Sequence, residues 1–346
     1  MLRSFALLAV SALALAACND QASTGGGGAR DQIRVVGSST VYPFTQLVAE
    51  QFVNKNPGMK APVIESTGTG GGMKLFCAGV GAQHPDIANA SRRMKASEYA
   101  DCKANGAADV IEAQVGIDGI AFAEAKNGPK ITLTTADIYK ALAANPGGNP
   151  NTAKTWKDVN PSLPAIPIRV YGPPSTSGTR DALAELILAK GCEETDAGAK
   201  ALDSDAFDKR CKAVREDGAY VDAGENDNLI VQKLQANPNA LGIFGYSYLE
   251  ENADKLNGAP INGVEPTYET IAGGSYPGAR PLYIYVKKAH LDAIPGLKQF
   301  LTEYAASWGK DGPLVKRGLI AAPDAVLAHS AEVLANATPL DPSVLK

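Results

Sequence analysis

Short apolar runs alternate with longer amphipathic segments along most of the chain. Residues 33–36 are predicted to form a strand, and residues 43–54 a helix whose apolar side chains recur on one face. Further strands are expected at 61–65 and 86–90. Strands that alternate with helices in this way predict an α/β fold with largely parallel sheets.

Two apolar segments far apart in the sequence are expected to connect two lobes. Residues 110–123 are rich in Val and Ile and are expected to cross from the first lobe to the second. Residues 281–286 are apolar and aromatic and are expected to return. We therefore predict a first lobe from 32–115 and 279–346, and a second lobe from 116–278. A chain of 346 residues is long enough for both.

The N-terminal residues have the pattern of an exported lipoprotein. A single arginine precedes an apolar run of thirteen residues, whereas a membrane-spanning helix needs about twenty. The run ends in Leu15-Ala16-Ala17-Cys18, which is the pattern of a lipobox. We predict a signal peptide over 1–17, lipidation of Cys18, and a flexible tether over 18–31, which is rich in Ser, Gly and Ala. The alternative is a plain signal peptide in which this cysteine is accidental.

Four of the five cysteines remain when Cys18 is set aside, namely Cys77, Cys102, Cys192 and Cys211. An even number in an exported chain predicts disulfides. The pairs Cys77–Cys102 and Cys192–Cys211 are the simplest of three connectivities, and each would contribute on the order of 3 kcal/mol. Metal binding is the alternative, but the chain has no CxxC motif and its three histidines are dispersed.

Three loops combine hydroxyl groups and glycine between a predicted strand and a helix. They span residues 37–40, 68–72 and 175–180. Helix N-termini have N–H groups without intrahelical partners, glycine permits close approach, and Ser, Thr and Arg side chains donate to oxyanions. One such loop is explained by ordinary helix capping. Three of them at junctions that line the crevice of an α/β sheet favour an oxyanion site.

Six segments, in this order, resemble the PstS-type phosphate-binding proteins, which are periplasmic receptors of the high-affinity phosphate ABC transporter. The segments are Val36–Phe44, Gly68–Lys74, Asp86–Arg92, Pro174–Arg180, Ala240–Tyr246 and Arg280–Tyr283. The resemblance implies a hinged, two-lobed periplasmic binding protein fold of type II. The ligand would lie in the cleft between the lobes, with no cofactor, no metal and no catalysis.

The resemblance also implies which residues contact phosphate. They are Ser39, Thr40, Val41, Thr69, Ser91 and Arg92 in the first lobe, and Ser177, Gly178, Thr179 and Arg180 in the second. The best-known members have an aspartate where this chain has Arg92, and that aspartate accepts the proton of phosphate. They also have an arginine where this chain has Pro173. We hypothesise that Asp222, Glu225 or Asn226 is the replacement acceptor.

We therefore expect a monomeric extracytoplasmic lipoprotein that captures inorganic phosphate and delivers it to an ABC permease in the inner membrane. Its only membrane contact would be the lipid. The net charge is −4 and both signs are interspersed, which argues against nucleic-acid binding because that would need clustered Lys and Arg residues. The alternatives on the same fold are binding of sulfate, molybdate or a phosphorylated organic solute, or a sensor or adhesin. A secreted phosphatase would need clustered Asp and His residues for metals.

Overall fold

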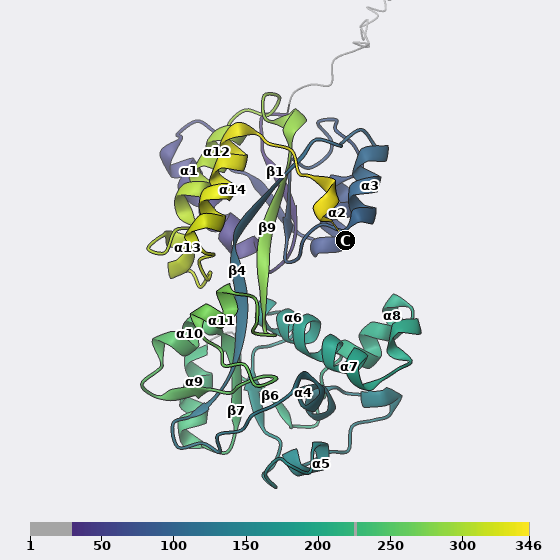
Figure 1. The fold of residues 1–346 in the computed structure, drawn as a ribbon. Helices are drawn as coiled ribbons and strands as arrows, with labels where there is room; N and C mark the ends of the chain where they lie inside the picture. The colour runs from purple at the N-terminus through teal and green to yellow at the C-terminus, as the bar shows by residue number, and fades with distance from the viewer. Residues whose placement is uncertain (1–29, 225–226, 346) are drawn as a thin grey trace, which may run out of the picture.

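The computed structural model describes residues 30–224 and 227–345, so Cys18, Glu225 and Asn226 lie outside the described residues. The chain forms two lobes that are joined by two long neighbouring strands, β4 (Val110–Ala125) and β9 (Ala279–Lys287) (Figure 1). β4 and β9 are antiparallel partners, with Asp118 opposite Arg280. This pair of strands forms the hinge region.

Three short strands complete the sheet of the first lobe: β1 (Arg34–Gly37), β2 (Val63–Ser66) and β3 (Ile87–Ala90). β1 is parallel to β2 and β3, whereas β9 is antiparallel to β3 and β4. The strand order is β2-β1-β3-β9-β4.

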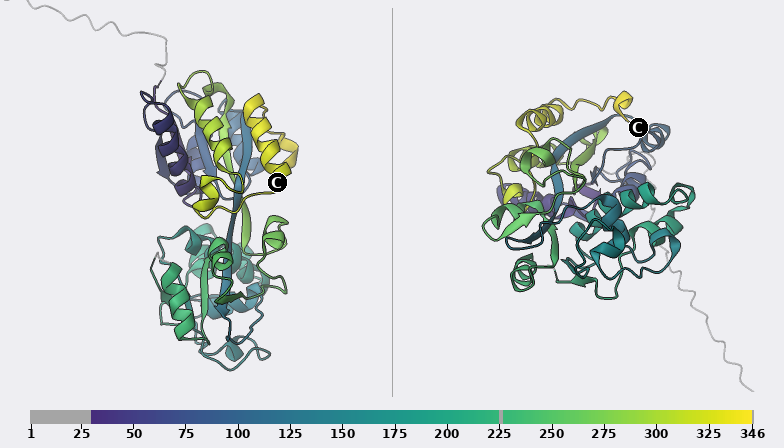
Figure 2. Two further views of the ribbon diagram at one scale, coloured as in Figure 1. Left: turned by 90° about the vertical axis from the view of Figure 1, so that its left-hand side faces the viewer. Right: turned by 60° about the horizontal axis from the view of Figure 1, so that its bottom comes forward.

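Helices cover both faces of this sheet, because side chains alternate between two faces along each strand. Ile87 belongs to the apolar core on one face and Ala88 to the core on the other. The helices on the first face lie side by side (Figure 2): α1 (Tyr42–Lys55), α12 (Leu297–Ser307) and α14 (Asp324–Asn336). Those on the second face are α2 (Thr69–Phe76) and α3 (Ala96–Ala104). The short α13 (Pro313–Lys316) lies near the hinge.

Helix α2 begins earlier than the sequence suggested. We expected a glycine loop to continue through Gly72, with the helix starting near Met73, but the helix starts at Thr69. The glycines are compatible with the helix because it packs directly on β1. A Cβ atom at Gly72 would lie 2.4 Å from the Cα of Gly37.

The sheet of the second lobe contains β5 (Val170–Gly172), β6 (Tyr220–Asp222), β7 (Leu241–Gly245) and β8 (Leu256–Gly258). β5 is parallel to β6 and β7, whereas β7 and β8 are antiparallel to β4. The expectation of largely parallel sheets is therefore wrong for the hinge strands. An antiparallel strand on an otherwise parallel sheet is common in α/β folds.

The helices of the second lobe are mostly short. They are α4 (Thr135–Leu142), α5 (Trp156–Val159), α6 (Gly178–Ala182), α7 (Ala189–Thr195), α8 (Ser204–Phe207), α9 (Asp227–Ala236), α10 (Tyr246–Glu251) and α11 (Tyr268–Ala272). A π-helical turn over Leu183–Leu188 joins α6 to α7. Among the described residues, no helix is long and apolar enough to cross a membrane.

Both disulfides of the simplest connectivity are present. Cys77–Cys102 joins the end of α2 to α3. Cys192–Cys211 joins α7 to a second π-helical turn, over Asp208–Lys212. The predicted pairing is therefore confirmed, and each bond lies within one lobe.

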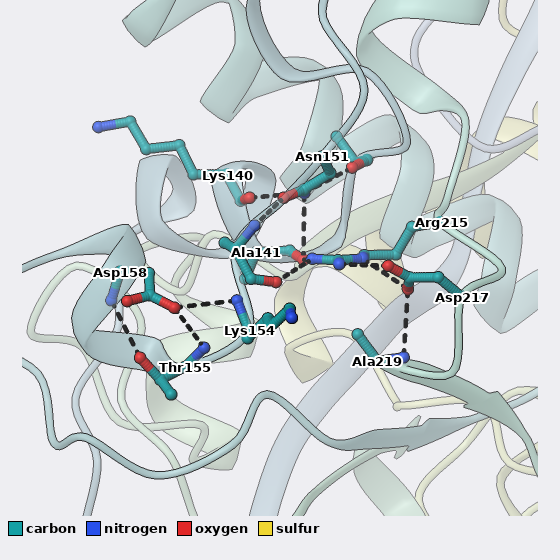
Figure 3. A network of polar contacts seen from close by, with 11 residues as sticks. Lys140, Ala141, Asn151, Lys154, Thr155, Asp158, Arg215, Asp217 and Ala219 are labelled. Carbon is teal, nitrogen blue, oxygen red and sulfur yellow. Dashed lines mark hydrogen bonds and ion pairs between the residues drawn. The ribbon is translucent and has the colours of Figure 1, made fainter.

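A buried arginine, Arg215, organises the end of α4 in the second lobe (Figure 3). One nitrogen of Arg215 donates to the carbonyl oxygens of Ala141, at 3.1 Å, and Ala153, at 2.9 Å. Its other nitrogens donate to the Asp217 carboxylate. The Asn151 side chain donates to the carbonyl of Lys140 at 2.8 Å. The bonds to Lys140 and Ala141 satisfy carbonyls at the end of α4, where a helix leaves them without intrahelical partners, and the bond to Ala153 ties the following loop to them.

Candidate functional site

The loops that follow β1, β2 and β3 in the first lobe converge. The amide of Thr67 donates to the Gly37 carbonyl at 2.9 Å, and the amide of Ser38 donates to the Asn89 carbonyl at 2.9 Å. The amide of Ser91 donates to the Thr69 hydroxyl at 3.1 Å. The loops after β1, β2 and β3 therefore form one continuous surface at the carboxyl ends of parallel strands, where α/β proteins bind their ligands.

Gly37 is required at the start of the first loop. Its φ of +126° is in a region that side chains disfavour, and a Cβ atom there would lie 2.2 Å from the Asn89 carbonyl oxygen. The chain therefore turns sharply after β1 and brings Ser39 and Thr40 to the edge that faces the second lobe.

The second lobe meets this surface at the start of α6. The Ser177 hydroxyl caps the helix by accepting from the Thr179 amide at 3.2 Å. A Cβ atom at Gly178 would lie 3.6 Å from the Cα of Thr40, which is ordinary contact. The Ser39 hydroxyl donates to an Asp181 carboxylate oxygen at 3.1 Å. The first loop and the Ser-Gly-Thr segment are therefore in direct contact across the lobes.

A cavity of about 420 Å³ lies between the lobes at this contact. Its walls include five of the predicted site residues, namely Ser39, Thr40, Ser177, Gly178 and Thr179. Asp118 on the hinge strand β4 also lines it. The cavity thus gathers hydroxyl groups from both lobes beside the hinge.

Three other predicted contacts of the first lobe, Val41, Thr69 and Ser91, do not line this cavity. Val41 is fully buried, and its amide donates to the Ser38 hydroxyl at 3.4 Å. The Thr69 and Ser91 hydroxyls are 3.1 Å apart and form a pair on the surface made by the converging loops.

Arg92 is paired within the first lobe. Its guanidinium donates two hydrogen bonds, of 2.9 and 2.7 Å, to the Glu98 carboxylate of α3. Burial alone would raise the pKa of Glu98, but the Arg92 hydrogen bond and the Lys95 amide outweigh it and lower that pKa. The pair holds the Arg92 charge beside α3.

Arg180 is held within the second lobe. Its guanidinium stacks on the Tyr220 ring, 4.1 Å from the centroid, and donates to the Pro173 carbonyl at 3.4 Å. Burial raises the pKa of Tyr220 to about 12, so its ring remains neutral at physiological pH. The hypothesised acceptor Asp222 is exposed and accepts from the Gly224 amide of its own turn at 2.8 Å.

A buried arginine on the hinge strand β9 was missed among the candidate contacts. Arg280 donates to the Thr40 hydroxyl at 3.0 Å and to Asp118 at 3.2 Å, and it is paired with Glu185 of the second lobe. The sequence did contain a signal, since Arg280 opens one of the six family-like segments. That segment was interpreted only as a hinge.

Asp118 and Asp181, two carboxylates near this arginine, are partly removed from water. Burial raises the pKa of Asp118, although the nearby Arg280 guanidinium opposes the shift. Burial also raises the pKa of Asp181, and the hydrogen bond from Ser39 opposes it. Among residues 30–224 and 227–345, no group of His, Cys, Asp and Glu side chains could hold a metal ion.

Comparison with known proteins identifies the family. A model described as the PBP superfamily domain matches residues 22–307. The chain belongs to the PBP superfamily. Protein SphX of Synechococcus elongatus is 35% identical over 282 residues, covering 79% of this chain and 73% of that protein. The phosphate-binding protein PstS of Staphylococcus epidermidis is 30% identical over 294 residues, covering 83% and 79%. Within the superfamily, the chain therefore belongs with the SphX and PstS proteins, as the six segments predicted.

Solved structures agree with this assignment. A protein described as a possible phosphate binding protein from Planctomyces limnophilus superposes with a TM-score of 0.72 at 33% identity, covering 89% of this chain and 98% of that one. PstS from Borrelia burgdorferi, at 21% identity and a TM-score of 0.58, shares the fold. The prediction of a two-lobed PBP fold of type II is confirmed. The PstS relative and the Planctomyces protein are both named as phosphate-binding proteins.

Proposed function

We propose that this PBP superfamily protein captures inorganic phosphate in the cavity between its lobes and delivers it to an ABC permease in the inner membrane. The names of its PstS relatives support phosphate as the ligand. The lipobox at Cys18 supports an extracytoplasmic protein that is attached to a membrane by its lipid.

The observation that carries the proposal is the composition of the cavity wall. Hydroxyl groups of Ser39 and Thr40 from the first lobe face a cavity shared with Ser177 and Thr179 from the second. Ser and Thr hydroxyls donate to phosphate oxygens while adding no charge. Residues from both lobes must come together to surround one anion, so binding would favour the closed arrangement by hinge motion.

Asp181 is a better candidate than Asp222 for the acceptor of the phosphate proton. Its carboxylate bonds the Ser39 hydroxyl of the first loop, whereas Asp222 is exposed in its own turn. Hydrogen phosphate carries a proton that can be donated to a carboxylate, and sulfate at neutral pH carries none. Asp181 is one hydrogen bond behind Ser39, which lines the cavity, and a carboxylate that reaches the bound anion would favour phosphate over sulfate.

Calorimetric titration of the purified protein, freed of bound anion, tests the proposal. We expect phosphate to bind and sulfate to bind much more weakly. Ser177→Ala should weaken phosphate binding about tenfold, because one donor to a charged ligand is lost. Ser162→Ala is the matched control, since Ser162 is exposed in the same lobe and donates only to Asn160. Absence of phosphate binding by the unmodified protein would refute the proposal.

The membrane anchor is tested separately by cell fractionation. The protein should sediment with membranes, and Cys18→Ala should abolish both this association and labelling by a radioactive fatty acid. An unmodified protein that stays entirely in the soluble fraction would refute the anchor while leaving phosphate binding untouched.

A further inference from the structure

Arg280 joins three parts of the molecule through one side chain. Its Nε donates to Asp118 of β4 at 3.2 Å, and one terminal nitrogen donates to the Thr40 hydroxyl of the first lobe at 3.0 Å. The other terminal nitrogen is paired with Glu185, which follows α6 in the second lobe. Every nitrogen of the guanidinium thus has an oxygen partner, and those partners belong to the hinge and to both lobes.

The bond to Thr40 determines what the threonine can offer to the cavity. A hydroxyl group has one hydrogen and can accept at its oxygen. Since Arg280 donates to that oxygen, the hydroxyl hydrogen of Thr40 must point away from the guanidinium. Thr40 itself lines the cavity. The arginine therefore orients Thr40 as a donor and sits one hydrogen bond behind the cavity wall.

The two arginines predicted for the site, Arg92 and Arg180, have their own partners. Arg92 is paired with Glu98 by two hydrogen bonds, and Arg180 stacks on Tyr220. Lys316 and Arg317 also border the cavity, but both are exposed, so water and salt screen their charges. A charge buried like that of Arg280 is screened far less.

The carboxylates around Arg280 differ in how easily they can leave. The Glu185 side chain is 49% exposed, whereas the Arg280 side chain is 8% exposed. Asp118 is 18% exposed and lies opposite Arg280 in the hinge ladder. Glu185 can therefore rotate into water, while Asp118 stays and keeps the guanidinium oriented.

We propose that Arg280 is the positioning residue that supplies the positive charge of the anion site, acting through Thr40, and that Glu185 neutralises this charge until the anion binds. This inference rests on the proposed function, because it deepens the account of the same cavity. Anion entry would release Glu185 from Arg280 and leave the guanidinium charge facing the ligand through the Thr40 hydroxyl.

The two partners of this ion pair give opposite predictions. Arg280→Gln should weaken phosphate binding about tenfold or more, because the charge behind Thr40 is lost. Glu185→Gln should tighten binding several-fold, on the order of the effect of one exposed ion pair, because the competing carboxylate is gone. An ion pair that merely holds the lobes together predicts weaker binding from both changes. Titration calorimetry with inorganic phosphate distinguishes these outcomes.

Matched controls come from an ion pair elsewhere in the protein. Arg93 and Glu112 of the first lobe are 3.0 Å apart, and neither lines the cavity. Arg93→Gln and Glu112→Gln should leave phosphate affinity unchanged. Thermal unfolding of each variant establishes that it is folded. If Arg280→Gln does not fold, the change of phosphate affinity in Glu185→Gln tests the proposal alone. Tighter binding supports the role assigned to Arg280, and weaker binding contradicts it.

The outcomes separate the two proposals. If the unmodified protein does not bind phosphate, the proposed function fails. If it binds phosphate but Arg280→Gln binds equally well, or if Glu185→Gln weakens binding, then the role assigned to Arg280 is wrong and the phosphate receptor stands.

Discussion

Arg215 and Arg280 are both buried, with exposed fractions of 6% and 7%. Arg215 donates to one carboxylate and two carbonyl oxygens, and Arg280 donates to two carboxylates and one hydroxyl oxygen. They differ in where their partners lie. The partners of Arg215 all belong to the second lobe, between Ala141 and Asp217. Those of Arg280 belong to both lobes and the hinge. The same side-chain chemistry therefore stabilises one lobe in the first case and couples two lobes in the second.

The largest effect is expected from Arg215→Met. Methionine fills much of the space but cannot donate, so the carbonyls of Ala141 and Ala153 lose a buried partner. We expect the free energy of unfolding to fall by about 2–4 kcal/mol, as measured by urea denaturation. Phosphate affinity at temperatures where the variant is folded should not change. A larger loss of affinity than in Arg280→Gln would show that the Arg215 network also supports the binding site.

The acidic partners of the two arginines should respond to pH in opposite directions. The hydrogen bond from Arg215 lowers the pKa of Asp217, so this pair stabilises the fold above the unfolded pKa. That contribution is lost as pH falls through the folded pKa. Burial raises the pKa of Asp118 despite Arg280. As pH falls, Asp118 is therefore protonated in the folded state before it is protonated in the unfolded chain. Its contribution to stability therefore grows as pH falls through the folded pKa.

Denaturation of Asp217→Asn and Asp118→Asn from neutral pH down to below the ordinary aspartate pKa of about 4 measures this contrast. The stability lost in Asp217→Asn relative to the unmodified protein should shrink as pH falls. Asp118→Asn removes the rise in stability on acidification. Parallel pH profiles for the two variants would show that both carboxylates serve the same structural role.

A smaller effect is expected on ligand selectivity. Asp181 accepts a hydrogen bond from Ser39, which lines the cavity, whereas Asp217 belongs to the Arg215 network. Asp181→Asn should reduce the preference for phosphate over sulfate several-fold, because the acceptor for the phosphate proton is lost. Asp217→Asn should leave the ratio of the two dissociation constants unchanged. Competition calorimetry with both anions measures the ratio, and an unchanged ratio in Asp181→Asn would remove it as the acceptor.

Much of the fold could be predicted because its signals are local. The strands at β1 and β3, the helix α1 and the two disulfides follow from apolar periodicity, hydroxyl-rich turns and cysteine spacing. The glycines of α2 misled the prediction, since their low helix propensity is overridden by close packing on β1.

The site could be predicted only as far as its loops. Ser39, Thr40 and the Ser177–Thr179 segment could be found because they lie in loops that combine hydroxyl groups and glycine between a strand and a helix. The structure brings them to one cavity. The partners of the arginines depend on tertiary structure. The sequence around Arg280 does not predict its contact with Asp118. The two residues are 162 positions apart, and their contact depends on the register of β4 and β9.

The crossing by two adjacent strands makes the second lobe a topological insertion. The chain leaves the first lobe along β4 and re-enters along β9, with Gly119 opposite Ala279. Partners in an antiparallel ladder have Cα atoms about 5 Å apart, so a linker of one or two residues can replace everything between them. A lobe grafted at these two positions from a relative would inherit the hinge unchanged, which makes this ladder a natural boundary for exchanging ligand specificity between receptors.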